Sequence, residues 1–162
     1  MAAAVQPKDW LDWHSARLSQ DHAVRLACFC AAVLPGDKQF ADLVAEQIKI
    51  ELLGLALHGR RTMERHNKKS ATLGSDPLWP TSTVESNAAN NLWEIFGRLI
   101  HAESIEIGWE EPDLTSNPYS ASGRNHHFAG HVVISKADVN DKFSIGAIVA
   151  AYLGSVLNQL PT

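Results

Sequence analysis

The stretch from Phe40 to His66 constrains the fold most, because apolar residues recur through it at helical spacing. They lie on one stripe of an α-helix and are Phe40, Val44, Ile48, Leu52, Leu55 and Met63. A stripe of this length has to be covered by other parts of the chain. We therefore expect a central helix over 38–66 with the remaining elements packed around it.

A second stripe of the same stretch is polar, although apolar residues flank it on both sides. It falls within an arc of roughly 80° and contains Gln47, Glu51, Gly54, His58, Arg61 and Arg65. Charged groups in such a position need partners or a cleft. Gly54 removes a side chain where another element can come close.

A similar polar spacing occurs once more along the chain. Glu51 precedes His58 by seven residues and Glu94 precedes His101 by seven, which places each pair on one helical face. We expect the two helices to meet along a buried charged seam that forms a binding site, made of Glu51, His58, Arg61, Glu94, Arg98 and His101. The pattern leaves open whether this seam is structural, an acid–base pair or a metal site of the carboxylate–histidine kind.

The rest of the chain predicts four further helices. A short helix carries Trp10 and Trp13, and a second begins at Ser19 as N-cap and ends before Pro35. A third covers 83–102, since Ser82 and Glu85 form a capping box directly before a run with helical periodicity. Ser144 caps the last one.

Strand patterns occur only between the last two helices. Residues 105–110 alternate between apolar and polar, 128–135 resume strand character, and a short strand is expected at 142–143. The predicted fold is α+β and mostly helical: four to five helices around the central helix 38–66, with a small two- or three-stranded antiparallel sheet before the C-terminal helix.

Length and composition agree with one domain over 1–162. At 162 residues, 45% of them hydrophobic and 20% charged, the chain can bury a sizeable core. It has no apolar run long enough for a membrane span, and Met1 to Pro7 lack the layout of a secretory signal. With only two cysteines, we expect a cytoplasmic protein that contacts no membrane.

The signatures of the common enzyme classes are missing from this sequence. It contains no glycine-rich phosphate loop, no G-x-S-x-G and no H-E-x-x-H. Because no three or four metal ligands show suitable spacing, we expect no bound metal and no cofactor.

One short pattern resembles a known motif. Arg124 is followed by Asn125 and, after six intervening residues, by His131. This resembles the motif of HEPN-type ribonucleases, in which the arginine and the histidine are thought to handle the scissile phosphate without a metal. The resemblance covers eight residues and implies Arg124 and His131 as catalytic residues. The family's motif lies on a helix, whereas here it falls on a predicted loop and strand.

Charge is unevenly distributed over a chain with a formal net charge of −4. A basic cluster consists of Arg60, Arg61, Arg65, Lys68 and Lys69. It could bind nucleic acid, or face an acidic segment of the same fold or of a second copy.

The preferred function is that of a cytoplasmic protein that binds a protein partner or itself. The alternative is a metal-independent HEPN-like ribonuclease, or another nucleic-acid-binding protein that uses arginine and histidine. Whether the protein is an enzyme stays open at this point.

Overall fold

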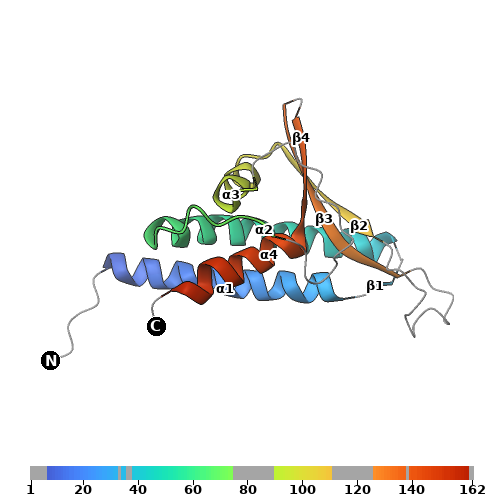
Figure 1. The fold of residues 1–162 in the computed structure, drawn as a ribbon. Coiled ribbons are helices and arrows are strands. Elements are labelled where there is room, and N and C mark those ends of the chain that lie inside the picture. The colour runs from blue at the N-terminus through green and yellow to red at the C-terminus, as the bar shows by residue number, and fades with distance from the viewer. Residues whose placement is uncertain are drawn as a thin grey trace.

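Two long antiparallel helices form the base of the molecule in the computed structural model, which describes residues 7–32, 34–35, 38–74, 90–110, 126–137 and 139–160. They are α1 (Pro7–Ala31) and α2 (Lys38–Arg65), and they lie side by side (Figure 1). In α2 the residues Ile48, Leu52, Leu55 and Met63 are fully buried, as the helical periodicity predicts.

An antiparallel sheet lies beside this helical pair. Its strands are β2 (Ser104–Glu110), β3 (His126–Lys136) and β4 (Val139–Ser144), and β3 pairs with both of the others. The two-residue strand β1 (Leu34–Pro35) pairs with the start of β3. The register shifts between Gly108 and Trp109 of β2, because β3 has one extra residue there, Gly130, as in a β-bulge.

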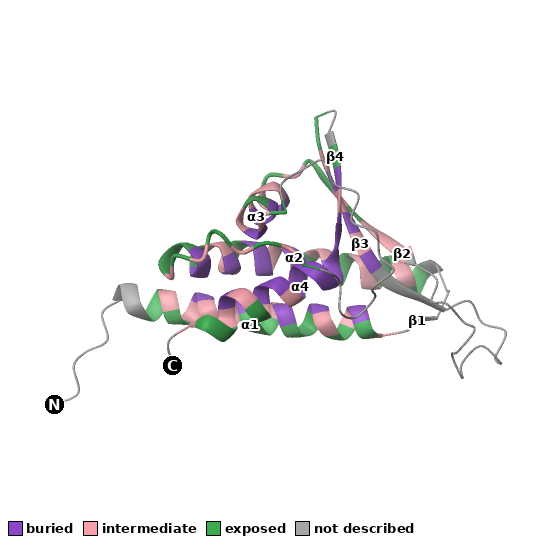
Figure 2. Cartoon of the chain, viewed as in Figure 1, coloured by how far each residue is buried: buried purple, intermediate pink, exposed green. Residues whose placement is uncertain are grey.

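The remaining helices close the core. Helix α3 (Leu92–Ile100) packs on α2, and α4 (Ile145–Ala151) lies across the two long helices (Figure 1). The chain then continues through a π-helical turn, η3 (Tyr152–Val156), and a 3-10 turn, η4 (Leu157–Gln159). Buried residues gather where α2, α4, β3 and β4 face one another (Figure 2).

The predicted fold class is confirmed: the protein is α+β and mostly helical, with an antiparallel sheet before the C-terminal helix. Ser144 caps α4 as expected, because its Oγ accepts a hydrogen bond from the Ala147 amide at 3.0 Å. Among the described helices, none has both the length and the apolar character needed to cross a bilayer.

The two predicted N-terminal helices are in fact one. Ser19 was expected to cap a second helix, but it is buried in the middle of α1. Its Oγ donates to the Ala16 carbonyl at 2.8 Å and accepts from the Tyr152 hydroxyl at 2.6 Å. The serine thus satisfies its hydroxyl inside the helix, which is the alternative to capping for this residue type.

The helix predicted over 83–102 corresponds to α3, which begins only at Leu92. Its expected capping box at Ser82 and Glu85 lies outside the described residues, but Asn90 and Asn91 are not helical. The Asn91 side chain accepts from the Glu94 amide at 3.0 Å and is the N-cap of α3. Phe40 also differs from expectation, since it is exposed instead of buried.

Candidate functional site

The six residues of the predicted seam separate onto two sides of α2. Glu51 and Arg61 pair with residues of α1, whereas Arg98 of α3 pairs with Asp141 of β4. The predicted contact between the two sets is therefore wrong. Helix α1, and not α3, covers the polar stripe of α2, and spacing within one helix could not reveal which neighbour would do so.

Glu51 is the centre of the polar network between α1 and α2. Its side chain is only 2% exposed. Its Oε2 accepts from His22 Nδ1 at 2.6 Å, and its Oε1 accepts from Gln47 at 2.7 Å and from Arg25 at 3.3 Å. Burial by itself would raise the pKa of Glu51, but these hydrogen bonds outweigh it and lower the pKa.

His22 reaches Glu51 by lying across Gly54. A Cβ atom on Gly54 would come within 2.4 Å of the His22 ring. The close approach predicted at Gly54 therefore occurs, and the approaching element is α1. The rings of His22 and His58 stack at 5.9 Å with an interplanar angle of 8°. Burial, followed by the charges of His22, His14 and Arg61, lowers the pKa of His58.

A carboxylate from α1 forms ion pairs with both members of the like-charged pair Arg61 and Arg65. Asp12 lies 3.4 Å from Arg61 Nε and 2.9 Å from Arg65 Nε. Sequence reasoning missed Asp12 and His22 because both come from another helix. The spacing of His22 and Arg25 at i, i+3 was the available signal, since it places two donors on one face of α1.

The basic cluster divides between two sides of α2. Arg61 and Arg65 face α1, whereas the Arg60 guanidinium lies over the Trp93 ring, 3.7 Å from its centroid. Lys69 Nζ lies 4.9 Å from the same ring, and Lys68 donates to Gln159 at 2.8 Å. Successive residues on a helix point about 100° apart, so adjacent arginines serve different surfaces.

The other predicted site residues gather beside α3 around a pocket of about 350 Å³, which we call the α3 pocket. Its lining consists of Arg60, Trp93, Glu94, Gly97, Arg98, His101 and Lys136. Glu94, Arg98 and His101 thus share one surface as predicted, but they share it with Arg60 of α2 and Lys136 of β3. Trp93 and Lys136 were not predicted.

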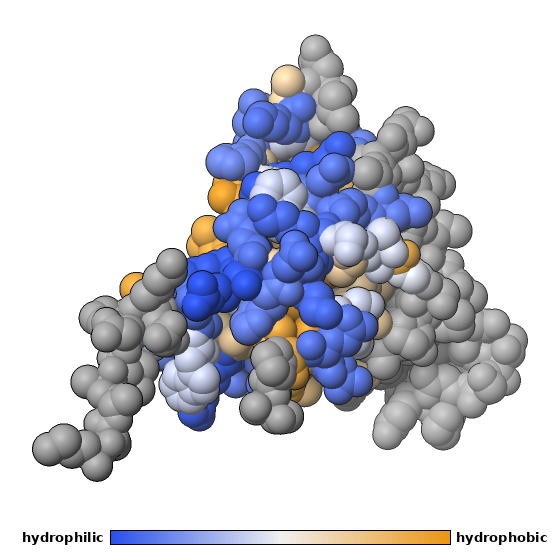
Figure 3. Space-filling view, turned by 60° about the vertical axis from the view of Figure 1, so that its left-hand side comes forward, coloured by the Kyte–Doolittle hydropathy of each residue, from blue (hydrophilic) through white to orange (hydrophobic). Residues whose placement is uncertain are grey.

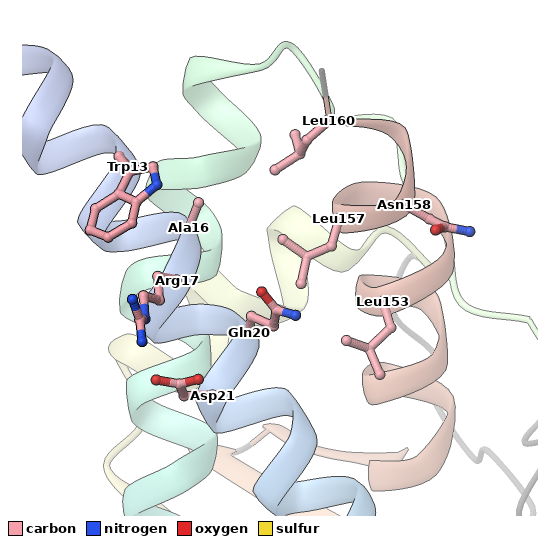
Figure 4. Close-up of a pocket in the computed structure, with 9 residues that line it drawn as sticks. All are labelled: Trp13, Ala16, Arg17, Gln20, Asp21, Leu153, Leu157, Asn158 and Leu160. Atoms are coloured by element: carbon pink, nitrogen blue, oxygen red, sulfur yellow. The ribbon is translucent and has the colours of Figure 1, made fainter. Parts of the chain in front are cut away.

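A larger groove of about 760 Å³ separates α1 from the C-terminal turns (Figure 4). Leu153, Leu157 and Leu160 point into it from one side, and α1 contributes Trp13, Arg17 and Asp21. Arg17 and Asp21 carry opposite charges, so this groove does not favour ions of one sign. The face drawn in Figure 3 is mostly hydrophilic, with apolar side chains confined to small patches.

Of the two catalytic residues implied by the ribonuclease-like motif, the histidine lies in the part of the chain that the structure describes. Arg124 lies outside the described residues. His131 is on β3 opposite Gly108, where a Cβ atom would collide with its ring. The His131 ring is therefore packed across the neighbouring strand β2 of the sheet.

Chemically, the α1–α2 network can position an imidazole for proton transfer, and the α3 pocket can hold an anion. Among the residues that the structure describes, no three or more histidine, cysteine, aspartate or glutamate side chains are placed to share a metal ion. In comparisons with known proteins, no family model, no curated protein and no solved structure matches this chain.

Proposed function

We propose that the protein is a binding module that acts through the outer side of α2, and that its partner on this surface is a second copy of the chain. The observation that supports this is a row of exposed apolar residues, which we call the outer stripe. Leu43, Ile50 and Leu57 form it and are 72%, 58% and 54% exposed. Leu53, which is partly buried, lies beside them.

The spacing of the outer stripe is suited to another helix. Its members are seven residues apart, so they drift by only about 20° per repeat and remain on one side of α2. Repeats of seven are typical of helices that pack along their length. Large apolar side chains arranged in such a row, instead of singly, mark interaction surfaces of soluble proteins.

Charges beside the outer stripe favour an antiparallel copy. Asp42 and the exposed Glu46 lie near its N-terminal end. Arg61 lies near its C-terminal end, and its side chain stays 46% exposed although it pairs with Asp12 of α1. When two copies of α2 run antiparallel about Ile50, the acidic end of one faces the basic end of the other. The arrangement is isologous, as in most homodimers.

Sedimentation equilibrium of the full chain tests this proposal. We expect a dimer for the wild type and a monomer for Ile50→Glu, because the substitution places two carboxylates against each other at the centre of the stripe. Val24→Glu is the matched control, since Val24 is an apolar residue of α1 that is 48% exposed. A monomeric wild type, or equal effects of the two substitutions, would contradict the proposal.

A second candidate is metal-independent cleavage of RNA by acid–base chemistry. The observation that favours it is the His22–Glu51 pair, because a carboxylate that holds an imidazole orients it for proton transfer. The lowered pKa of the neighbouring His58 favours a neutral ring that can accept a proton.

The RNA-cleavage candidate is tested by incubating pure protein with mixed single-stranded RNA and a chelator. Loss of cleavage in His22→Ala with His58→Ala would support the helical network as the site. Loss in Arg124→Ala with His131→Ala would support the motif found in the sequence. Cleavage that survives both double substitutions would exclude both assignments.

A further inference from the structure

The α3 pocket brings together cations from several elements. Arg60 comes from α2, Arg98 from α3 and Lys136 from β3. Asp141 pairs with Arg98, but no carboxylate in the described part of the chain pairs with Arg60 or Lys136. Two uncompensated cations at one hollow favour an anionic ligand.

The pocket also offers a planar surface. The Arg60 guanidinium lies over the Trp93 ring, with their centres 3.7 Å apart. Arginine stacks on rings through both charge and shape, so the side of the guanidinium that is turned away from Trp93 suits a further planar group. Gly97 makes this possible, since a Cβ atom there would lie 2.6 Å from Arg60 Nη1.

A carboxylate at the edge of the pocket adds a third feature. Glu94 is exposed and lines the same hollow. An ionised carboxylate only accepts hydrogen bonds, so it suits a ligand with hydroxyl or amino donors. Inorganic phosphate alone would leave Glu94 facing a negative charge.

We propose that the α3 pocket binds a nucleotide, with the phosphate between Arg60 and Lys136, the base against the Arg60–Trp93 stack and the sugar hydroxyls near Glu94. At about 350 Å³ the pocket is at the lower end of the size range of ligand sites, which suits a single nucleotide. The nucleotide can be free or the terminal unit of a single strand. The α3 pocket and the outer stripe have no residue in common, so nucleotide binding does not depend on self-association.

Calorimetric titration of the full chain tests the site with four probes: adenosine monophosphate, adenosine, inorganic phosphate and a short 5′-phosphorylated RNA. We expect the monophosphate to bind at least about tenfold more tightly than adenosine or phosphate, since only it uses both features of the pocket. If the RNA binds and adenosine monophosphate does not, the site is assigned to the end of a strand. If neither adenosine monophosphate nor the RNA shows saturable binding, the proposal is overturned. If inorganic phosphate binds as tightly as adenosine monophosphate, the proposed role of the base is overturned.

The chain offers a matched control for the arginine. Arg17 lies over Trp13 at 5.7 Å on α1, so Arg17→Ala removes the same charge from a similar pair elsewhere. We expect Arg60→Ala to weaken binding about tenfold or more and Arg17→Ala to leave it unchanged. Equal losses in the two variants would show that only net charge matters and would overturn the assignment.

Two further variants separate ligand contact from folding. Lys136 is exposed, so Lys136→Ala should bind about tenfold more weakly while its circular dichroism stays that of the wild type. Gly97→Ala keeps every charge but displaces Arg60, and it should also weaken binding. Unchanged binding in both variants would overturn the proposed geometry. Ile50→Glu should bind as the wild type does, which keeps this result separate from that of the sedimentation experiment.

Discussion

At the scale of single residues, Glu51 shows how a buried charge is accommodated in this fold. Donors from both long helices, His22, Arg25 and Gln47, surround its carboxylate. A buried charge with several donors is stable, whereas the loss of one member leaves the others without a partner. Glu51 therefore stabilises the fold whether or not the network also takes part in catalysis.

We predict that Glu51→Gln lowers the free energy of unfolding by about 1–3 kcal/mol, because a neutral amide cannot accept from three donors. The exposed Glu106 of β2 is the matched control, and Glu106→Gln should cost under about 0.5 kcal/mol. Urea unfolding at pH 7 measures both. Equal costs would mean that the network adds nothing.

The same variant tests the lowered pKa of Glu51. A carboxyl whose pKa is lower in the folded state contributes stability above its ordinary pKa, and this contribution is lost as the pH falls through the folded value. The wild type should therefore lose more stability than Glu51→Gln between pH 5 and 3. Parallel pH profiles would contradict the assignment.

At the scale of elements, the contact between α1 and α2 depends on a glycine. In an exposed helix, alanine is favoured over glycine by roughly 1 kcal/mol. At Gly54 this preference should reverse and glycine should be the more stable residue, because the new methyl group would collide with the His22 ring. The two helices would have to separate, or His22 would have to leave Glu51.

We predict that Gly54→Ala destabilises the protein, whereas Gly154→Ala is neutral or stabilising. Gly154 is also in a helical segment, but a Cβ atom there meets nothing within 4 Å. Thermal unfolding of the two variants provides the comparison. A stable Gly54→Ala protein would show that His22 has another position available at little cost.

Elements were predictable from the sequence where a local signal determines them. The periodicity of α2 and the Ser144 cap depend on neighbours along the chain, and both were predicted. The prediction that Ser19 caps a helix was wrong, although serine is a common N-cap residue. Its hydroxyl bonds instead to Tyr152, which is 133 residues away in the chain. The predicted seam failed for the same reason, since residues of other elements decide which side of α2 faces which helix.

The α3 pocket was predicted in part. Glu94, Arg98 and His101 recur at helical spacing and therefore could be grouped. Lys136 joins them only because β3 and α3 meet in the folded chain, and Trp93 becomes part of the site only through Arg60. Long-range packing of this kind leaves no pattern within one segment.

At the scale of the whole molecule, one hydroxyl connects helix α1 to the C-terminal segment. The fully buried Tyr152 donates a hydrogen bond to Ser19 of α1 at 2.6 Å. Burial raises the pKa of Tyr152, although the neighbouring hydroxyls of Ser19 and Thr62 act in the opposite direction. The native state therefore favours the neutral phenol.

We predict that Tyr152→Phe lowers the free energy of unfolding by about 1 kcal/mol at pH 7, the usual net contribution of a hydrogen bond. Because the pKa is higher in the folded state, the unfolded chain releases this proton first, and wild-type stability should fall as the pH rises past the ordinary tyrosine range. Tyr152→Phe should lack that part of the fall. Chemical unfolding at pH 7 and pH 11, with Ser19→Ala and the double variant, measures the coupling, and additive losses would show that the bond contributes nothing.

The π-helical turn after α4 lets the C-terminal segment hold one extra residue without changing which side chains line the groove in Figure 4. A π turn encloses one more residue than an α turn, and this one begins at the buried Tyr152 and ends before the leucines at positions 157 and 160 that point into the groove. If Gly154 were deleted, the segment could close as a regular α-helix with Tyr152 still in the core. The later side chains would then keep nearly their present direction, because the π turn takes up that one residue, and both leucines would still point toward α1.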